Sequence, residues 1–297
     1  MINLEKILKQ DRQIRATTGL NRKAFEALLP SFEEAYQQML DKKRRWRAAG
    51  GGRKATLKTS ADKLFFILLY CKCYPTFDLM SVIFGFDRSC ANDWVHRLLP
   101  ILETALGKKQ ALPERKIHSI EEFLAKFADV KEVIIDGTER PVQRPKDAEQ
   151  QKEHYSGKKK RHTRKHVTGS TRKKWIILLS KARAGKVHDK KQLHEEDWVS
   201  NIPDQVVIEG DLGYQGLQNE FVNIRLPHKK PRGQELTEEQ KQENREFSSL
   251  RVKCEHAHGG MKRYNSVTAV YRNRVTDFDD RLMLNAAGLW NFYLDAS

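Results

Sequence analysis

The sequence has too few cysteines and too few long apolar stretches for several large classes of protein. Its 297 residues include four cysteines, which do not make a disulfide framework in a chain of this size. The longest apolar run, residues 64–71, is far too short to span a bilayer. The first residues also lack the charged, apolar and small-residue sections of a signal peptide. We therefore expect a cytoplasmic protein rather than a secreted or membrane protein.

Acidic residues are in deficit as well. The chain has 39 Asp and Glu against 55 Lys and Arg, which gives a net charge of +16 and a pI near 9.6. This balance favours a polyanionic partner, and nucleic acid is the most common one. An anionic membrane surface is the alternative. It is disfavoured because the basic clusters do not lie on a long amphipathic helix with a bulky apolar face.

Residues 1–58 are predicted to form two helices and a basic linker. Apolar residues at helical spacing predict a helix from about Asn21, with Thr18 as its cap. The linker carries basic residues at 42–47 and 53–54, separated by three glycines, and it contains Trp46. A flexible, solvated connection and a segment that follows a phosphate backbone both remain open for it.

Residues 59–107 have the pattern of a helix-turn-helix. Helices are predicted at 61–73, capped by Ser60, at 76–84, and from Ser89 onward, with a glycine turn at Gly85 before the last one. The residues that this last helix would present to DNA are Arg88, Ser89, Asn92 and His96. Ordinary packing of three short helices is the alternative, and the surrounding positive charge favours DNA binding.

Residues 130–297 alternate strands and helices. Strands are predicted at 130–136, 171–182 and 205–211, a helix leads through Leu193 to Trp198, a long helix begins near Thr237, and an amphipathic helix covers 276–294. This order is typical of a ribonuclease H-like domain. We therefore predict an α/β fold, with a ribonuclease H-like catalytic domain preceded by a helical, helix-turn-helix-like DNA-binding domain.

Three acids in the second domain are candidates for a metal site. Asp136 and Asp211 each end a short apolar run, and Glu255 lies on the long helix. Hard cations such as Mg²⁺ prefer carboxylate oxygens on rigid elements, and two such ions promote in-line attack at phosphorus. Glu209 lies two residues before Asp211 and points to the same side of a strand, so it is a rival ligand.

Cations accompany this acidic set. Arg251, Glu255 and Lys262 fall within about 40° of one another on a helix that turns about 100° per residue, so Arg251 and Lys262 would contact DNA phosphates. A solvated salt-bridge face is the alternative. The basic run at Lys158, Lys159, Lys160 and Arg161 is a further candidate for DNA binding. Zinc at Cys254, His256 and His258 is disfavoured, because no second ligand pair is evident.

Five motifs occur in order between about residue 60 and the C-terminus. They are Asp136-Gly-Thr-Glu-Arg-Pro, Tyr155-Ser-Gly-Lys-Lys-Lys-Arg-His-Thr, Gly185-Lys-Val-His-Asp-Lys-Lys, Asp211-Leu-Gly-Tyr-Gln-Gly and Arg251-Val-Lys-Cys-Glu-His. Together they resemble bacterial insertion-sequence transposases of the DDE superfamily. The nearest group is the insertion-sequence-five type, which is related to Harbinger-type transposases.

The resemblance implies a ribonuclease H-like core in which Asp136, Asp211 and Glu255 bind Mg²⁺, with Mn²⁺ as a substitute. It implies transposition at terminal inverted repeats, double-stranded target DNA, a homo-oligomeric synaptic complex and association with a prokaryotic nucleoid. The family's tyrosine–arginine–glutamate–lysine signature matches Arg251, Glu255 and Lys262, but its tyrosine falls at Ser248. A non-catalytic repressor or domesticated relative, and a nuclease without strand transfer, remain the alternatives.

Overall fold

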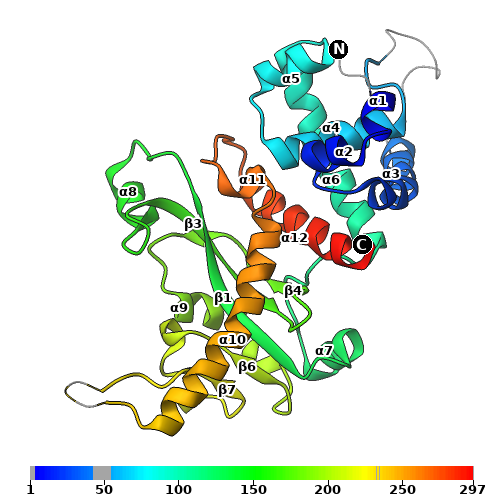
Figure 1. The fold of residues 1–297 in the computed structure, drawn as a ribbon. Helices are drawn as coiled ribbons and strands as arrows, with labels where there is room; N and C mark the ends of the chain where they lie inside the picture. The colour runs from blue at the N-terminus through cyan, green and yellow to red at the C-terminus, as the bar shows by residue number, and fades with distance from the viewer. Residues whose placement is uncertain (1–3, 43–54, 232, 234, 297) are drawn as a thin grey trace. The chain divides into compact units, whose positions relative to one another are not determined.

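The computed structural model describes residues 4–42, 55–231, 233 and 235–296 (Figure 1). The chain divides into a helical unit, formed by residues up to 112, 261–269 and 275 onward, and a sheet unit, formed by residues 113–260 and 270–274. The last helix, α12 (Phe278–Ala296), lies in the helical unit, although its residues fall within the expected catalytic domain. Among the described residues, no helix has both the length and the apolar character to cross a bilayer.

Three helices open the helical unit where the sequence predicted two. They are α1 (Leu4–Leu8), α2 (Asp11–Thr18) and α3 (Arg22–Lys42). Asn21 caps α3, because its Oδ1 accepts a hydrogen bond from the Ala24 N–H at 2.7 Å. The prediction of Thr18 as this cap is wrong, since Thr18 ends α2 and donates its hydroxyl proton to the Ile14 carbonyl. Lys42, where the predicted linker begins, is the last residue of α3, and the rest of the linker, 43–54, lies outside the described residues.

The predicted three-helix pattern continues the helical unit. Its members are α4 (Ser60–Cys73), α5 (Phe77–Phe84) and α6 (Arg88–Lys108). Thr59, rather than Ser60, caps α4 through a reciprocal pair of hydrogen bonds with Asp62. Gly85 ends α5 with φ +72°, a left-handed conformation that glycine adopts without steric cost. Residues 63–71 of α4 are buried on every side, so α4 forms the centre of this unit.

The sheet unit is built around five strands joined in the order β4–β3–β1–β6–β7. Their bounds are β1 (Glu132–Pro141), β3 (Arg161–Ser170), β4 (Ile176–Leu179), β6 (Val207–Glu209) and β7 (Ile224–Arg225). β3 is antiparallel to β1 and β4, whereas β6 runs parallel to β1 and to β7. The short strands β2 (Tyr155–Ser156) and β5 (Arg183–Ala184) also pair with β3.

Helices complete the sheet unit. They are α7 (Ile120–Phe127), α8 (Ala148–His154), α9 (Asp189–Glu196) and the long α10 (Glu238–Met261), which crosses the sheet in Figure 1. Val133, Ile135 and Ile208 pack with Trp198 into one apolar core. α10 begins as predicted, because Thr237 and Gln240 form a capping box with bonds of 3.1 and 3.2 Å.

Three strands differ from the predictions in this part of the sheet. β1 does not end at Asp136 but continues to Pro141, because residues 136–141 pair with residues 163–168 of β3. β3 itself was not predicted, since its sequence is strongly basic at its start. The predicted strand at 171–182 is reduced to β4, and the preceding residues form a turn in which the Lys174 N–H donates to the Thr171 carbonyl. Strand pairing, rather than local apolar character, sets these limits.

Candidate active site

Asp136 and Asp211 lie at the same level on neighbouring chain segments. Parallel pairing aligns Glu132 with Val207 and Ile134 with Glu209, so the same register continued by two residues sets Asp136 beside Asp211. Asp211 lies two residues after the end of β6 and caps a short turn, where its Oδ1 accepts a hydrogen bond from the Gly213 N–H at 2.8 Å. Asp136 Oδ1 accepts from the Gly137 N–H at the same distance. The structure therefore brings the two predicted aspartates together.

The electrostatics of Asp136 reflect this arrangement. Burial is the main cause that raises the pKa of Asp136, and the negative charge of Asp211 raises this pKa further. Arg251 and Lys158 act in the opposite direction, together with the Gly137 N–H. Two partly buried carboxylates that repel each other are a suitable environment for a divalent cation, because its charge offsets both the burial and the repulsion.

A third aspartate, which the sequence analysis did not assign, lies beside this pair. Asp189 begins α9. A Cβ added to Gly137 would lie 3.1 Å from Asp189 Oδ1, and one added to Gly213 would lie 3.7 Å from Asp189 Oδ2. Asp189 belongs to the motif at 185–191, which carried the family resemblance but no proposed role. The motif was therefore the feature of the sequence from which Asp189 could have been identified.

The buried Tyr214 side chain is affected by the same carboxylates. Burial raises the pKa of Tyr214 well above its usual value, and the charges of Asp189, Asp136 and Asp211 add to the effect. Lys165 supplies a counter-charge, since its Nζ lies 2.9 Å from Asp189 Oδ1. A side chain at Gly137 or Gly213 would come close to the Asp189 carboxylate, so the available space favours glycine at both positions.

Glu209, the rival second ligand, is engaged elsewhere. Its side chain forms a carboxyl–carboxylate hydrogen bond with Glu132, and burial followed by the charge of Glu132 raises the pKa of Glu209 to about 7. Arg172 forms an ion pair with Glu132. Arg172 and Arg225 also lower the pKa of Glu209, which places two cations around the pair. The geometry therefore favours Asp211 over Glu209 as the partner of Asp136.

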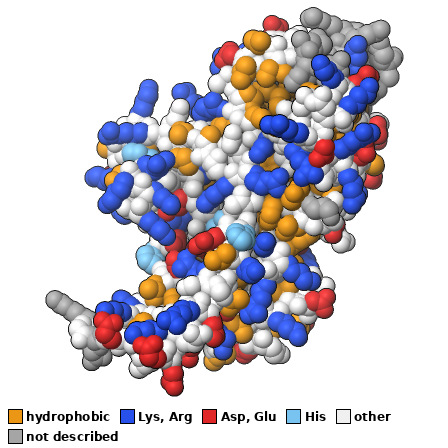
Figure 2. Space-filling view, in the orientation of Figure 1, with side chains coloured by type: hydrophobic (Ala, Val, Ile, Leu, Met, Phe, Trp, Pro, Cys, Tyr) orange, Lys and Arg blue, Asp and Glu red, His pale blue; other side chains and the backbone are white. Residues whose placement is uncertain are grey.

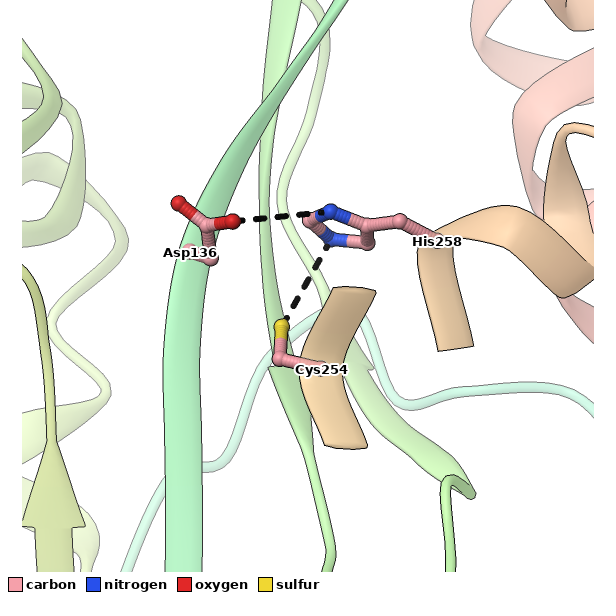
Figure 3. Close-up of side chains that lie close together, drawn as sticks. All are labelled: Asp136, Cys254 and His258. Carbon is pink, nitrogen blue, oxygen red and sulfur yellow. Dashed lines mark hydrogen bonds and ion pairs between the residues drawn. The ribbon is translucent and has the colours of Figure 1, made fainter. Parts of the chain in front are cut away.

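The face of α10 that meets the sheet carries Cys254 and His258 (Figure 3). Both are buried, and His258 Nδ1 lies 3.6 Å from Asp136 Oδ2. Glu255, the predicted third metal ligand, is the next residue after Cys254 and its side chain is exposed. Arg251 is half-buried on the same helix and acts on the charge of Asp136.

Lys262 does not share this helix. α10 ends at Met261, so Lys262 lies in the turn that follows, and it belongs to the helical unit. The prediction of one helix face for Arg251, Glu255 and Lys262 is therefore wrong for its last member. A glycine pair at 259–260 precedes the helix end, and glycine is a poor helix former.

The predicted DNA-reading residues of α6 differ in exposure. Arg88 is exposed at the first position of the helix and lies 3.6 Å from Asp78. Ser89 is exposed and Asn92 is half-buried. His96 packs its ring against Phe278 of α12, with 4.6 Å between the ring centroids. The surface available to a DNA groove is therefore at the start of α6, not at His96.

The predicted basic run forms the tip of a hairpin. Residues 157–160 make the turn between β2 and β3, and Lys158, Lys159, Lys160 and Arg161 are all exposed. Figure 2 shows Lys and Arg side chains gathered over the region of α8 and β3. The charge of Lys158 lowers the pKa of Asp136, so this tip acts on the same site as the aspartates.

Comparisons with known proteins connect this geometry to a family. Residues 135–291, more than half of the chain, match the family described as DDE superfamily endonuclease, and residues 56–108 match the helix-turn-helix of DDE superfamily endonuclease. The chain is also similar to the probable transposase for insertion sequence element IS702 of Microchaete diplosiphon, with 29% identity over 283 residues that cover 95% of each chain. No solved structure matches the chain.

Proposed function

The chain belongs to the DDE superfamily endonuclease family, and on that premise we propose that it is a transposase that cleaves DNA at terminal inverted repeats and transfers the ends to target DNA. The observation that carries the proposal is the register that sets Asp136 beside Asp211 on parallel segments. The strand order, with β4, β3 and β1 antiparallel and β6 and β7 parallel to β1, supports a ribonuclease H-like core.

Members of this family use divalent metal ions, and we propose Mg²⁺, with Mn²⁺ as a substitute. Asp136 and Asp211 would hold the metal, with Glu255 of α10 as the third carboxylate. The fit rests on the raised pKa of Asp136, which follows from burial and the facing charge of Asp211. When bound, such metals activate the attacking oxygen and stabilise the leaving oxygen during phosphodiester cleavage. Gly137 and Gly213 hold the two aspartates through their backbone N–H groups.

The cations near Asp136 would bind and orient the DNA backbone. Arg251 lies on α10 and Lys158 at the hairpin tip, and both act on the charge of Asp136. Phosphate oxygens are the natural partners of such groups, and their contacts set position rather than sequence. Arg88 at the start of α6 would read the terminal repeats in the major groove. Lys262 would contribute a further phosphate contact from the helical unit.

The remaining elements of the proposal concern assembly. Two element ends must be brought together before joining, so we propose a homo-oligomeric synaptic complex on double-stranded DNA, in the cytoplasm and associated with the nucleoid. We propose that the chain works as three functional segments, 1–58, 59–107 and 130–297. The first two would bind the DNA ends. The basic composition of the chain supports a DNA partner.

Variants of the three acids test the proposal. Asp136→Asn, Asp211→Asn and Glu255→Gln are each expected to abolish Mg²⁺-dependent cleavage while binding to the element ends persists. Glu246→Gln is the matched control for Glu255→Gln, because Glu246 is another exposed glutamate on α10. Cleavage that survives Glu255→Gln would remove that residue from the metal site.

Product analysis on paired-end DNA separates transposition from simple hydrolysis. Joined products are expected with wild-type protein and Mg²⁺. Free ends without joined products indicate a nuclease, and binding without any strand scission under Mg²⁺ or Mn²⁺ indicates a repressor. The flanks of the coding region offer an independent check, since a transposase gene should lie between short inverted repeats.

A further inference from the structure

A second metal-ligand group shares Asp136 with the proposed active site. Asp136, Cys254 and His258 each present one ligand atom, and these atoms lie within 4.8 Å of one another (Figure 3). Among the described residues, this is the group of three or more His, Cys, Asp or Glu side chains that satisfies such a distance. Nothing in the proposed phosphoryl transfer uses the thiol or the imidazole, so the group needs its own explanation.

The local structure holds the three side chains in place. Cys254 and His258 are four residues apart on α10 and therefore lie on one face of the helix. Their relative exposures are 1% and 6%, so both point into the protein against β1 and β3. Sγ of Cys254 lies 3.9 Å from Nε2 of His258, and Nδ1 of His258 lies 3.6 Å from Oδ2 of Asp136.

Thr168 of β3 fixes the histidine ring. Its Oγ1 lies 2.7 Å from His258 Nε2 and donates its single proton to the Asp136 carbonyl oxygen at 3.3 Å. The hydroxyl therefore accepts the hydrogen bond from Nε2–H, and Nδ1 is the nitrogen that faces the Asp136 carboxylate. A histidine that binds a metal commonly donates its other N–H to such an oxygen, so Thr168 is in the position of an outer partner.

We propose that Asp136, Cys254 and His258 bind Zn²⁺. Thiolate and imidazole ligands select Zn²⁺ over Mg²⁺, which requires oxygen ligands in near-octahedral geometry. Bond lengths of about 2.0–2.3 Å in a tetrahedral site place ligand atoms roughly 3.3–3.7 Å apart. The 3.6 Å between His258 Nδ1 and Asp136 Oδ2 lies within that range, and the three ligand atoms all lie within 4.8 Å of one another, so small rotations of the side chains close the site.

Binding replaces a bond to hydrogen with a bond to metal. The Cys254 S–H bond breaks, the Zn–S bond forms, and the proton passes to the buffer. Three protein ligands leave the fourth tetrahedral position to water or another oxygen. Because Asp136 is common to both sites, Zn²⁺ at this group removes that carboxylate from the proposed Mg²⁺ site. This inhibitory consequence, unlike the binding itself, rests on the proposed function.

Cobalt spectroscopy on the purified full chain tests the binding without any activity. Co²⁺ replaces Zn²⁺ in such sites and gives a thiolate-to-metal charge-transfer band when a cysteine binds it. We expect one equivalent of Co²⁺ per chain, the band, and its loss on addition of Zn²⁺. The band should vanish in Cys254→Ser and persist in Cys73→Ser, the matched control, because Cys73 is an exposed cysteine in the helical unit.

Two further variants keep the test decisive if Cys254→Ser does not fold. His258→Gln removes a ligand and should weaken Co²⁺ binding at least tenfold. Thr168→Val removes the outer partner and should weaken it roughly 10–100-fold with the ligands intact. Absence of the band in wild-type protein at saturating Co²⁺, or its persistence in both Cys254→Ser and His258→Gln, overturns the zinc site.

A cleavage assay then separates this inference from the proposed function. Stoichiometric Zn²⁺ is expected to inhibit Mg²⁺-dependent cleavage by wild-type protein but not by Cys254→Val, whose side chain fills the space without a metal ligand. A cobalt band in a chain that never cleaves DNA supports the zinc site and overturns the transposase proposal. Cleavage without any cobalt band does the reverse.

Discussion

Lys165 Nζ lies 2.9 Å from Asp189 Oδ1, the oxygen that a Cβ added to Gly137 would approach to 3.1 Å. Lys165 also donates to the Val187 carbonyl at 2.9 Å and lies 4.0 Å from Glu139. A single buried cation thus serves two carboxylates on different elements, since Glu139 is on β1 and Asp189 begins α9. We conclude that this ion pair fixes the start of α9 against the site.

Removal of this cation should destabilise the protein. Lys165→Met leaves Asp189 and Glu139 without their shared partner, and breaking a largely buried pair from one side costs about 3 kcal/mol. Urea denaturation measures the loss. Lys191→Met is the control: Lys191 is 71% exposed and lies 3.9 Å from Glu195, so its removal should cost less than about 0.5 kcal/mol. Equal effects of the two variants would contradict a structural role for Lys165.

The Glu132–Glu209 pair should make stability depend on pH. The pKa of Glu209 is raised to about 7 in the folded protein, against about 4.3 in an unfolded chain. The folded protein therefore holds a proton that the unfolded chain has lost, so this contribution is complete below about pH 4 and is lost as pH rises through about 7. Its size is at most about 4 kcal/mol.

Glu209→Gln should flatten this profile, because glutamine cannot lose a proton and can donate a hydrogen bond to Glu132. Denaturation of both proteins between pH 4 and 8, with a chelator present, measures the difference. Parallel profiles for wild type and variant would show that Glu209 titrates as an ordinary glutamate.

Arg88 and His96 should affect different properties, although both lie on α6. Arg88→Ala is expected to weaken binding to the element ends by about 1–3 kcal/mol with unchanged stability, because the side chain is exposed. His96→Ala should lower the thermal midpoint with little specific loss of DNA affinity, since its ring packs on Phe278. Fluorescence anisotropy with repeat and scrambled DNA tests the pair. The opposite assignment of effects would place the DNA groove at His96.

The hairpin tip should contribute sequence-independent affinity. Replacing Lys158, Lys159, Lys160 and Arg161 by alanine is expected to reduce the slope of log affinity against log salt by about 0.9 for each lost phosphate contact. Thermal stability should not change, because all four side chains are exposed. An unchanged salt slope would mean that the tip does not touch DNA.

Local signals made much of the helical structure predictable. The caps of α5 and α10 and the glycine after α5 are short-range features, so the helix-turn-helix pattern is visible in the sequence, and the family match over 56–108 confirms it. The transposase family was likewise predicted from its ordered motifs and is confirmed by the match over 135–291. Asp136 and Asp211 were predicted because each follows an apolar run, and the register of β1 with β6 sets them side by side; their role in binding a metal stays a prediction.

Long-range pairing accounts for what was missed. β3 is basic in sequence and becomes a strand because β1 and β4 pair with its two edges. Glu209 was left as a rival of Asp211, since only the register with β1 reveals its partner Glu132. Cys254 and His258 lacked a second ligand in the sequence because Asp136 is more than a hundred residues away. The position of Glu255 in the metal site stays a prediction.

The central claim is that Asp211, and not Glu209, completes the metal site with Asp136. The direct test is the rate of Mg²⁺-dependent cleavage of element-end DNA by Asp211→Asn and by Glu209→Gln. The cleavage rate of Asp211→Asn should fall by more than about 100-fold, because mutation of residues that only hydrogen-bond to metal ligands already costs roughly 10–100-fold. The cleavage rate of Glu209→Gln should stay within about threefold of the wild-type rate, well below the loss expected for a metal ligand. Retained cleavage in Asp211→Asn, together with its loss in Glu209→Gln, would contradict the account.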